Sequence, residues 1–266
     1  MAKERKNWSW EETIMALSVY CTLPRKEHHG SNLEVQNLAK IIERNPDAVK
    51  MKIANFWGLD PELKRRGLRG LPHGSKMDEK VWNEFYGNWE NLVYENERLV
   101  AKYTAEHAAK HPGEHVADVA ENKYEIDLPQ GKEREQIVRA REKQGFFRKA
   151  ILSSYSEKCC ITGLKVPDLL IASHIIPWSA NEQQRLNPHN GLCLNALHDK
   201  AFDRGLITVS STNYKVMLSS KIHDLKASKA VKEFFGKFDG KKIAMPEKFF
   251  PEKEFLEYHK SEIFKR

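Results

Sequence analysis

The chain contains few cysteines and no long run of apolar residues. Only four of its 266 residues are cysteine, and Cys159 and Cys160 are chain neighbours, which rarely bridge each other. This excludes a disulfide-rich scaffold and predicts a reducing compartment. No apolar run has the length that crosses a bilayer, and the first ten residues lack the apolar core of a signal peptide. We therefore expect a cytoplasmic protein that binds no membrane.

Acidic residues are outnumbered by basic ones. Lys and Arg together number 44 against 37 Asp and Glu, which gives a net charge of +7 and an isoelectric point near 9.1. This balance favours a polyanionic partner without identifying it. Nucleic acid is the leading candidate.

The length allows one large domain or two smaller ones, and we expect two. Residues 106–130 lose helical periodicity and gain proline, glycine and charge, which is the composition of a linker. The sequence predicts a helical domain at 1–105, a linker at 106–130 and a second domain at 131–266.

Three histidines at the start of the linker fall four residues apart. Such spacing could place His107, His111 and His115 on one helix face as metal ligands. Pro112 and Gly113, however, interrupt any helix that would align them. We therefore expect solvated histidines.

Helical periodicity is clear in the N-terminal part. Trp10, Ile14, Leu17 and Cys21 recur at spacings of four and three, after a Ser9 that is followed three residues later by Glu12, the signature of a capping box. Two more short helices are expected at 33–42 and 46–56, the second with Asn45 as its cap and Pro46 in its first turn.

This helix pair is typical of a helix-turn-helix reader of DNA. Its second helix would present Lys50, Lys52 and Asn55 to a groove. The loop that follows places Arg65, Arg66 and Arg69 among glycines, where they could contact phosphates. The alternatives are a helical domain that only packs on its neighbour and a solvated run of charge.

Aromatic residues form a stripe at helical spacing further along. Trp82, Phe85 and Trp89 are spaced by three and four, and aromatics at that spacing are usually core. If the domain does not bury them fully, they are the candidate interface of a dimer.

A basic amphipathic helix is expected at 134–155. It carries apolar residues on one face and charge on the other, so it could clamp phosphates beside a catalytic site, the alternative being a solvated helix face. The candidate DNA contacts in this region are Arg139, Arg141, Gln144 and Arg148.

Three polar residues follow within one strand, loop, strand and helix pattern. His174 interrupts an apolar strand, Asn190 precedes a glycine, and His198 lies in a helical segment, at separations of 16 and 8 residues. A ββα unit could fold the first and last together. Cleavage of a phosphodiester needs a base that deprotonates water and a cation that holds the phosphate, and histidines suit both tasks.

The motifs around these residues are "CCITG", "ASHIIPW" and "NPHNGLCLNALHDKAFDRG". The C-terminal half resembles the HNH endonucleases of the His-Me finger superfamily, in a bacterial subgroup related to restriction enzymes. The N-terminal stretch "NPDAVKMKIANFWGLDP" is similar to a domain that often accompanies such nucleases. The resemblance implies that His174 is the general base, that Asn190 pins the loop between the strands, and that His198 binds the catalytic Mg²⁺ or Mn²⁺.

The resemblance leaves the metal shell incomplete, because many relatives have an acidic residue where this chain has Ser173. Asp199 and Asp203 are the nearest carboxylates, although they point about 100° and 140° away from His198 on a helix. Asp203 is the favoured ligand of the two. Arg204 is expected to meet a phosphate.

These observations predict an α+β protein, mostly helical, with an N-terminal helix-turn-helix-like domain and a C-terminal ββα nuclease domain. We expect a restriction endonuclease that cuts double-stranded DNA as a homodimer, since one ββα unit hydrolyses one strand per engagement. A nicking monomer, an enzyme that requires methylated DNA, and a DNA-binding regulator with an inactive nuclease fold are the alternatives. The presence of both His174 and His198 favours an enzyme.

Overall fold

The computed structural model describes residues 7–68, 74–114, 144–225 and 228–265, which form two compact units, Met1–Lys143 and Gln144–Arg266. The described chain is mostly helical with two small antiparallel sheets, in agreement with the predicted α+β class. Among the described residues, no helix combines the length and the apolar character needed to cross a bilayer.

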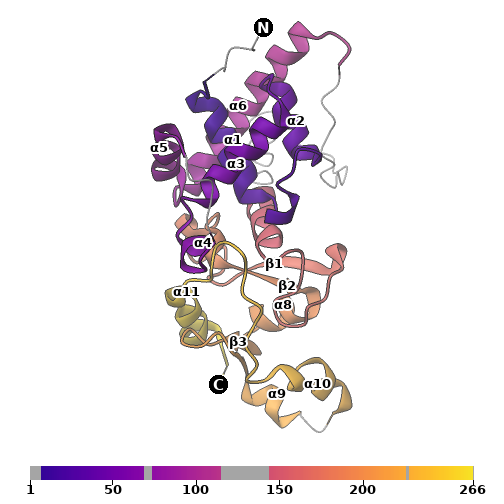
Figure 1. Ribbon diagram of the computed structural model, residues 1–266. Helices are drawn as coiled ribbons and strands as arrows, with labels where there is room; N and C mark the ends of the chain where they lie inside the picture. The colour runs from indigo at the N-terminus through magenta and orange to yellow at the C-terminus, as the bar shows by residue number, and fades with distance from the viewer. Residues whose placement is uncertain (1–6, 69–73, 115–143, 226–227, 266) are drawn as a thin grey trace. The chain divides into compact units, whose positions relative to one another are not determined.

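The N-terminal unit is a bundle of helices packed around α1, which contacts α2, α3, α5 and α6 (Figure 1). The two caps expected from the sequence are present: Ser9 and Glu12 form a capping box, and Asn45 caps the helix that begins at Pro46. The helices are α1 (Trp10–Thr22), α2 (Leu33–Ile41), α3 (Pro46–Trp57), α4 (Pro61–Arg65), α5 (Lys76–Phe85) and α6 (Trp89–Lys110), with a 3-10 turn, η1, at Arg25–Glu27.

The aromatic stripe lies in the core of this bundle. Trp82, Phe85 and Trp89 are all buried, and Trp82 packs against the rings of Tyr20 and Tyr86. The stripe also spans two helices rather than one, because Gly87 adopts a left-handed backbone between α5 and α6. The stripe is therefore not the dimer interface suggested by the sequence.

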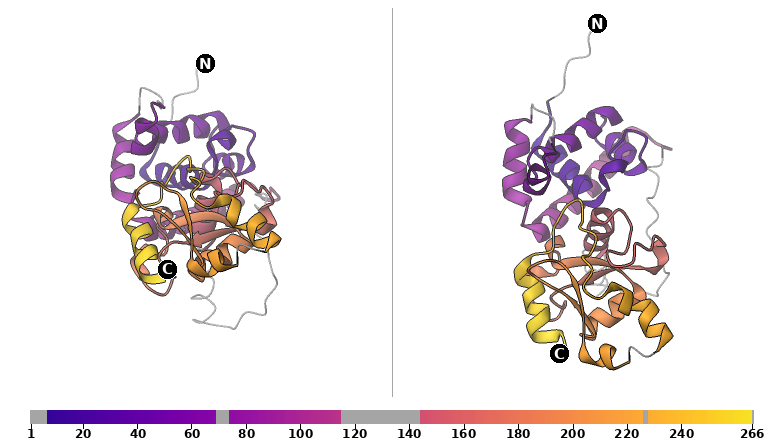
Figure 2. Two further views of the ribbon diagram at one scale, coloured as in Figure 1. Left: turned by 90° about the horizontal axis from the view of Figure 1, so that it is seen from below. Right: turned by 60° about the horizontal axis from the view of Figure 1, so that its bottom comes forward.

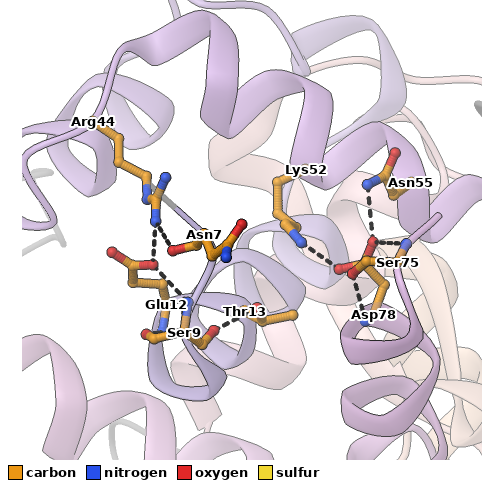
Figure 3. A network of polar contacts seen from close by, with 9 residues as sticks. All are labelled: Asn7, Ser9, Glu12, Thr13, Arg44, Lys52, Asn55, Ser75 and Asp78. Atoms are coloured by element: carbon orange, nitrogen blue, oxygen red, sulfur yellow. Dashed lines mark hydrogen bonds and ion pairs between the residues drawn. The ribbon is translucent and has the colours of Figure 1, made fainter. Parts of the chain in front are cut away.

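A buried carboxylate joins α3 to α5 (Figure 3). Asp78 forms an ion pair with Lys52 and accepts hydrogen bonds from the Asn55 side chain at 2.9 Å and the Ser75 amide at 2.9 Å. The Lys52 side chain is only 4% exposed. The expectation that Lys52 faces a DNA groove is thus wrong, because its side chain is buried against Asp78, whereas Asn55 is half-buried with its amide bound to the same carboxylate.

The C-terminal unit begins with a helix that is described from residue 144 to 154. Two hairpins and several short helices follow, and α11 continues directly into a π-helical segment, η6 (yellow in Figure 2). The elements are η2 (Pro167–Leu169), β1 (Leu170–His174), η3 (Glu182–Gln184), η4 (Pro188–Asn190), β2 (Gly191–Asn195), α8 (Ala196–Asp203), β3 (Ile207–Val209), β4 (Val216–Leu218), α9 (Ser220–Asp224), α10 (Lys229–Phe234), η5 (Gly236–Phe238), α11 (Lys253–Tyr258) and η6 (His259–Ile263).

The first hairpin and α8 form the ββα arrangement expected from the sequence. β1 and β2 pair antiparallel, with Leu170 opposite Asn195 and His174 opposite Gly191. A Cβ atom at Gly191 would lie 2.3 Å from the Ile151 side chain and 2.9 Å from that of Phe147, so a larger residue here would require the side chains of the helix at 144–154 to shift. The predicted second hairpin is also present, as β3 and β4.

The cysteines are free and buried, as expected. The backbone amide of Cys160 donates a hydrogen bond of 2.8 Å to the carbonyl of Cys193. Burial raises the pKa of the Cys193 thiol to about 12. Burial also raises the pKa of Cys160, so the Cys160 and Cys193 thiols remain protonated at neutral pH and contribute to the core as small apolar groups.

The buried His259 of η6 packs against Phe202 of α8. The His259 ring stacks on Phe202 at 3.6 Å, its Nε2 donates to the Phe202 carbonyl, and its Nδ1 therefore accepts from the Thr208 hydroxyl at 2.8 Å. Burial lowers the pKa of His259 from 6.5 to about 4, an effect that the Phe202 carbonyl only partly opposes.

This histidine should make the stability of the C-terminal unit depend on pH. Its folded-state pKa is depressed, so the unfolded state binds the extra proton, and stability present above pH 6.5 is lost as pH falls towards 4. The expected loss is about 3 kcal/mol. Denaturant unfolding of the full chain from pH 7 to pH 4 measures it: His259→Gln should flatten the dependence, whereas His223→Gln, at an exposed site, should not. An unchanged slope in His259→Gln would contradict this assignment.

Candidate active site

His174 lies at the end of β1 and is held on three sides. Its ring stacks on Phe147 at 3.9 Å and meets the edge of Trp178 at 5.5 Å. Its Nε2 is 2.9 Å from the carbonyl oxygen of Arg185. Because a carbonyl only accepts, Nε2 carries the proton of the neutral ring, and Nδ1 keeps its lone pair. The neutral ring therefore keeps Nδ1 able to accept a proton.

Burial sets the proton affinity of this imidazole. Loss of solvent lowers the pKa of His174 below its usual value, while the Arg185 carbonyl and the carboxylate of Asp199 raise it in part. The ring is thus neutral near pH 7 and able to accept a proton. Asp199 is positioned to stabilise the imidazolium that forms when it does.

Asn190 fastens the loop that follows β1. The residue is almost fully buried, and its side chain spans the loop: Oδ1 accepts from the Ile176 amide at 2.8 Å, and Nδ2 donates to the carbonyls of Ile176 and Gln184, both at 3.1 Å. Gln184 immediately precedes Arg185, whose carbonyl orients His174. Asn190 therefore fixes the backbone that orients the base.

His198 lies in the first turn of α8, with its ring turned towards aromatic residues. Nδ1 is 3.0 Å from Asn195 Oδ1, an acceptor, so Nε2 holds the lone pair. Nε2 is buried and has no hydrogen-bond partner at normal distance in the described chain. The rings of Phe235 and Phe238 lie 5.3 and 5.5 Å away, and burial lowers the pKa of His198, opposed in part by the backbone of Phe234.

Two aspartates lie on α8, and the first of them, Asp199, interacts electrostatically with His174. Asp199 and Asp203 are separated by four residues, so they share one face of the helix, about 40° apart. Burial raises the pKa of both carboxyls, and in Asp199 the Ser173 hydroxyl, Lys200 and His174 oppose this effect. Ser173 is buried, and its Oγ makes no hydrogen bond of normal length to the described residues.

The structure groups the candidate metal ligands differently from the sequence-based expectation. The structure brings Ser173, His174 and Asp199 together, with Asp203 one helical turn away. His198 points from another face of α8 and contacts none of them in the described structure. Carboxylate oxygens are the ligands that Mg²⁺ prefers, and the buried hydroxyl of Ser173 beside Asp199 adds a further oxygen there.

The predicted DNA contacts other than Lys52 and Asn55 fall into three groups. Lys50, Arg65, Arg66, Gln144 and Arg204 are exposed on the units that carry them. Arg148 is exposed as well, but its guanidinium donates to the carbonyls of Leu170 and Pro167, so it supports the start of β1. Arg69, Arg139 and Arg141 lie outside the described residues, as does His115.

Sequence reasoning missed Phe147 and undervalued Asp199. No local pattern connects Phe147 to His174, because 27 positions separate them. The pairing of Asp199 with Asp203 was detectable from their spacing of four.

Comparison with known families bears on this unit. A family model described as HNH endonuclease matches residues 159–210. The matched segment is therefore similar to HNH endonucleases. This HNH segment includes both strands of the first hairpin, α8 and β3, and hence His174, Asn190, His198 and the two aspartates. A comparison with curated proteins gave no match.

The match supports a nuclease domain, with DNA as its substrate and a divalent cation of the kind that HNH nucleases generally use. The residues present fit such a cation. Asp199 and Asp203 could supply oxygen ligands from one face of α8, and the buried Ser173 hydroxyl lies beside Asp199. The buried ring of His198, which lies near the backbone of Phe234, could offer a second, nitrogen-based position.

Proposed function

We propose that the protein is a metal-dependent HNH endonuclease that hydrolyses double-stranded DNA, acting in restriction. The observation that carries the proposal is the His174 imidazole, whose Nε2 is committed to the Arg185 carbonyl while Nδ1 holds a lone pair. A neutral, oriented imidazole next to a carboxylate is the arrangement that general-base hydrolysis needs.

The residues divide the reaction between them. Nδ1 of His174 takes a proton from the attacking water, whose oxygen forms the new bond to phosphorus while the bond to the leaving oxygen breaks. Asp199 stabilises the resulting imidazolium, and Asn190 holds the loop so that the ring does not turn. A divalent cation held by Asp199 and Asp203, Mg²⁺ or Mn²⁺, would neutralise charge on the phosphate and on the leaving oxygen.

Recognition is assigned to the N-terminal unit. Lys50 on α3, together with Arg65 and Arg66 after it, offers exposed positive charge, which supports phosphate contacts rather than base reading. Lys52 and Asn55 take no part, because they bind Asp78. A homodimer on a palindromic site would supply the second ββα unit that a double-strand break requires.

Incubation of supercoiled plasmid with the purified protein tests the proposal. Cleavage should occur in Mg²⁺ or Mn²⁺ and cease in excess EDTA. Plasmids prepared with and without methylation would show whether modified bases are required. Binding of DNA with no cleavage in any divalent metal would favour the alternative of a regulator with an inactive nuclease fold.

Asp199→Asn should slow cleavage by about 10- to 100-fold, because the amide cannot replace the carboxylate as a cation ligand or as the partner of the imidazolium. A titration of the rate against Mg²⁺ concentration should show a raised requirement for the metal. Asp224→Asn is the matched control, since Asp224 is exposed on α9 of the same unit. Wild-type cleavage by Asp199→Asn would remove Asp199 from the site.

A further inference from the structure

A cluster of ionisable groups lies in the N-terminal unit, outside the nuclease site. α6 continues to Lys110, which lies within the predicted linker of 106–130. His107 is therefore in the last turn of the helix, and His111 follows its last residue directly. Their rings are 4.6 Å apart. Glu43, in the turn between α2 and α3, completes the cluster, and one donor atom from each residue lies within 4.8 Å of the others.

His107 is the unusual member of this cluster. It is only 5% exposed, and neither ring nitrogen has a hydrogen-bond partner in the described chain. The nearest carboxylate, Glu114, is 3.8 Å from Nε2, which is too long for a hydrogen bond. A neutral imidazole has one donor and one acceptor, and leaving such groups buried without partners costs about 1–3 kcal/mol each. A ligand at this nitrogen would remove part of that cost.

The surrounding geometry suits a metal ion. Glu43 adopts a left-handed backbone with φ of 54°, an uncommon conformation for a residue other than glycine, and its Oε1 lies 4.0 Å from His111 Nε2. Glu43 and His111 are both 42% exposed, so their side chains have room to rotate. Donors around a tetrahedral zinc lie roughly 3.4 Å apart, given bonds of about 2.1 Å.

We propose that Glu43, His107 and His111 bind a transition metal of the zinc type, which joins the end of α6 to the turn between α2 and α3. Two imidazole nitrogens and one carboxylate are a ligand set that favours Zn²⁺ over Mg²⁺, and water fills the remaining position. The site is distinct in chemistry from the oxygen-rich site on α8 and does not depend on the nuclease proposal. It also replaces the expectation that these histidines are merely solvated.

Lys110 gives the site a built-in competitor. Its ammonium is 2.8 Å from Glu43 Oε1, and this contact raises the pKa of Lys110. A metal at the cluster must share or displace that contact. Removal of Lys110 should therefore strengthen metal binding, whereas removal of a ligand should weaken it.

Zinc binding by the full-length protein tests the proposal. After treatment with EDTA and dialysis, the protein is titrated with Zn²⁺ in excess Mg²⁺, which occupies oxygen-rich sites. We expect uptake of one equivalent and a rise in melting temperature. His111→Ala and Glu43→Gln, both at exposed positions, should weaken zinc binding at least tenfold and keep the helical circular dichroism. Lys110→Ala should tighten it, and His29→Ala, at an exposed histidine beside Glu27, should match wild type.

Two results would overturn the proposal. One is a wild-type protein that takes up no zinc in excess Mg²⁺. The other is full retention of zinc affinity in His111→Ala and Glu43→Gln. Because DNA cleavage is not the readout, neither result affects the assignment of the nuclease site.

Discussion

His174→Ala is expected to reduce the rate of DNA cleavage by at least about 100-fold, the lower end of the range for loss of a general base. No other described side chain offers an oriented nitrogen lone pair at that end of β1, because Trp178 and Arg185 present only donors there. DNA binding should persist, since His174 contributes no charge in its neutral form. Cleavage kinetics and a binding assay in Ca²⁺ or EDTA separate the two effects.

The space left by this substitution provides a second measurement. His174 stacks directly on Phe147, so His174→Ala leaves a flat apolar surface on which free imidazole can rest. Added imidazole should restore part of the rate, with a pH dependence that follows the added base. His223→Ala is the control, because His223 is an exposed histidine of the same unit. A rate close to wild type in His174→Ala, without imidazole, would show that the base is another group.

Asp78→Ala is expected to destabilise the N-terminal unit by about 3–5 kcal/mol, the cost of breaking a buried ion pair on one side. The substitution leaves the Lys52 ammonium buried without its counter-ion and removes the acceptor for Asn55 and the Ser75 amide. Five of the six tryptophans lie in this unit, so tryptophan fluorescence during denaturant unfolding reports on it. Asp47→Ala, at an exposed aspartate of α3, should cost less than about 1 kcal/mol.

A second substitution distinguishes burial of charge from loss of packing. Adding Lys52→Met to Asp78→Ala removes the uncompensated ammonium, so the double variant should be more stable than Asp78→Ala alone. If Lys52 instead read DNA, Lys52→Met would change sequence choice without lowering stability. A double variant less stable than Asp78→Ala would show that the ion pair is not the source of the loss.

Local signals in the sequence predicted the elements well. The capping box of Ser9 and Glu12 and the Asn45 and Pro46 start of α3 are both present, because caps satisfy backbone groups within one turn. The ββα order and the second hairpin were also predicted, since apolar strands and turn residues are short-range features. Such features need no knowledge of distant partners.

Errors arose where a distant residue decides the environment. Lys52 was expected on an exposed face, although it lies among the buried positions Val49, Ile53 and Phe56 of α3. Helical periodicity alone indicated that burial, but only the position of Asp78, 26 residues away, explains how the charge is tolerated. The contacts of His198 with Phe235 and Phe238 were likewise not visible, because more than 30 residues separate the ring from its neighbours.

The stacking of Phe147 on His174 also has a consequence for recombination between genes that encode such domains. The recognisable HNH segment starts at residue 159, whereas Phe147 and Ile151 lie before it and meet His174 and Gly191. Recombination that joined two genes at the edge of the recognisable segment would pair one parent's hairpin with the other parent's helix. Gly191 could then meet a side chain larger than Ile151, or His174 could lack the aromatic ring on which it stacks. The heritable module is therefore longer than the motif by which it is recognised.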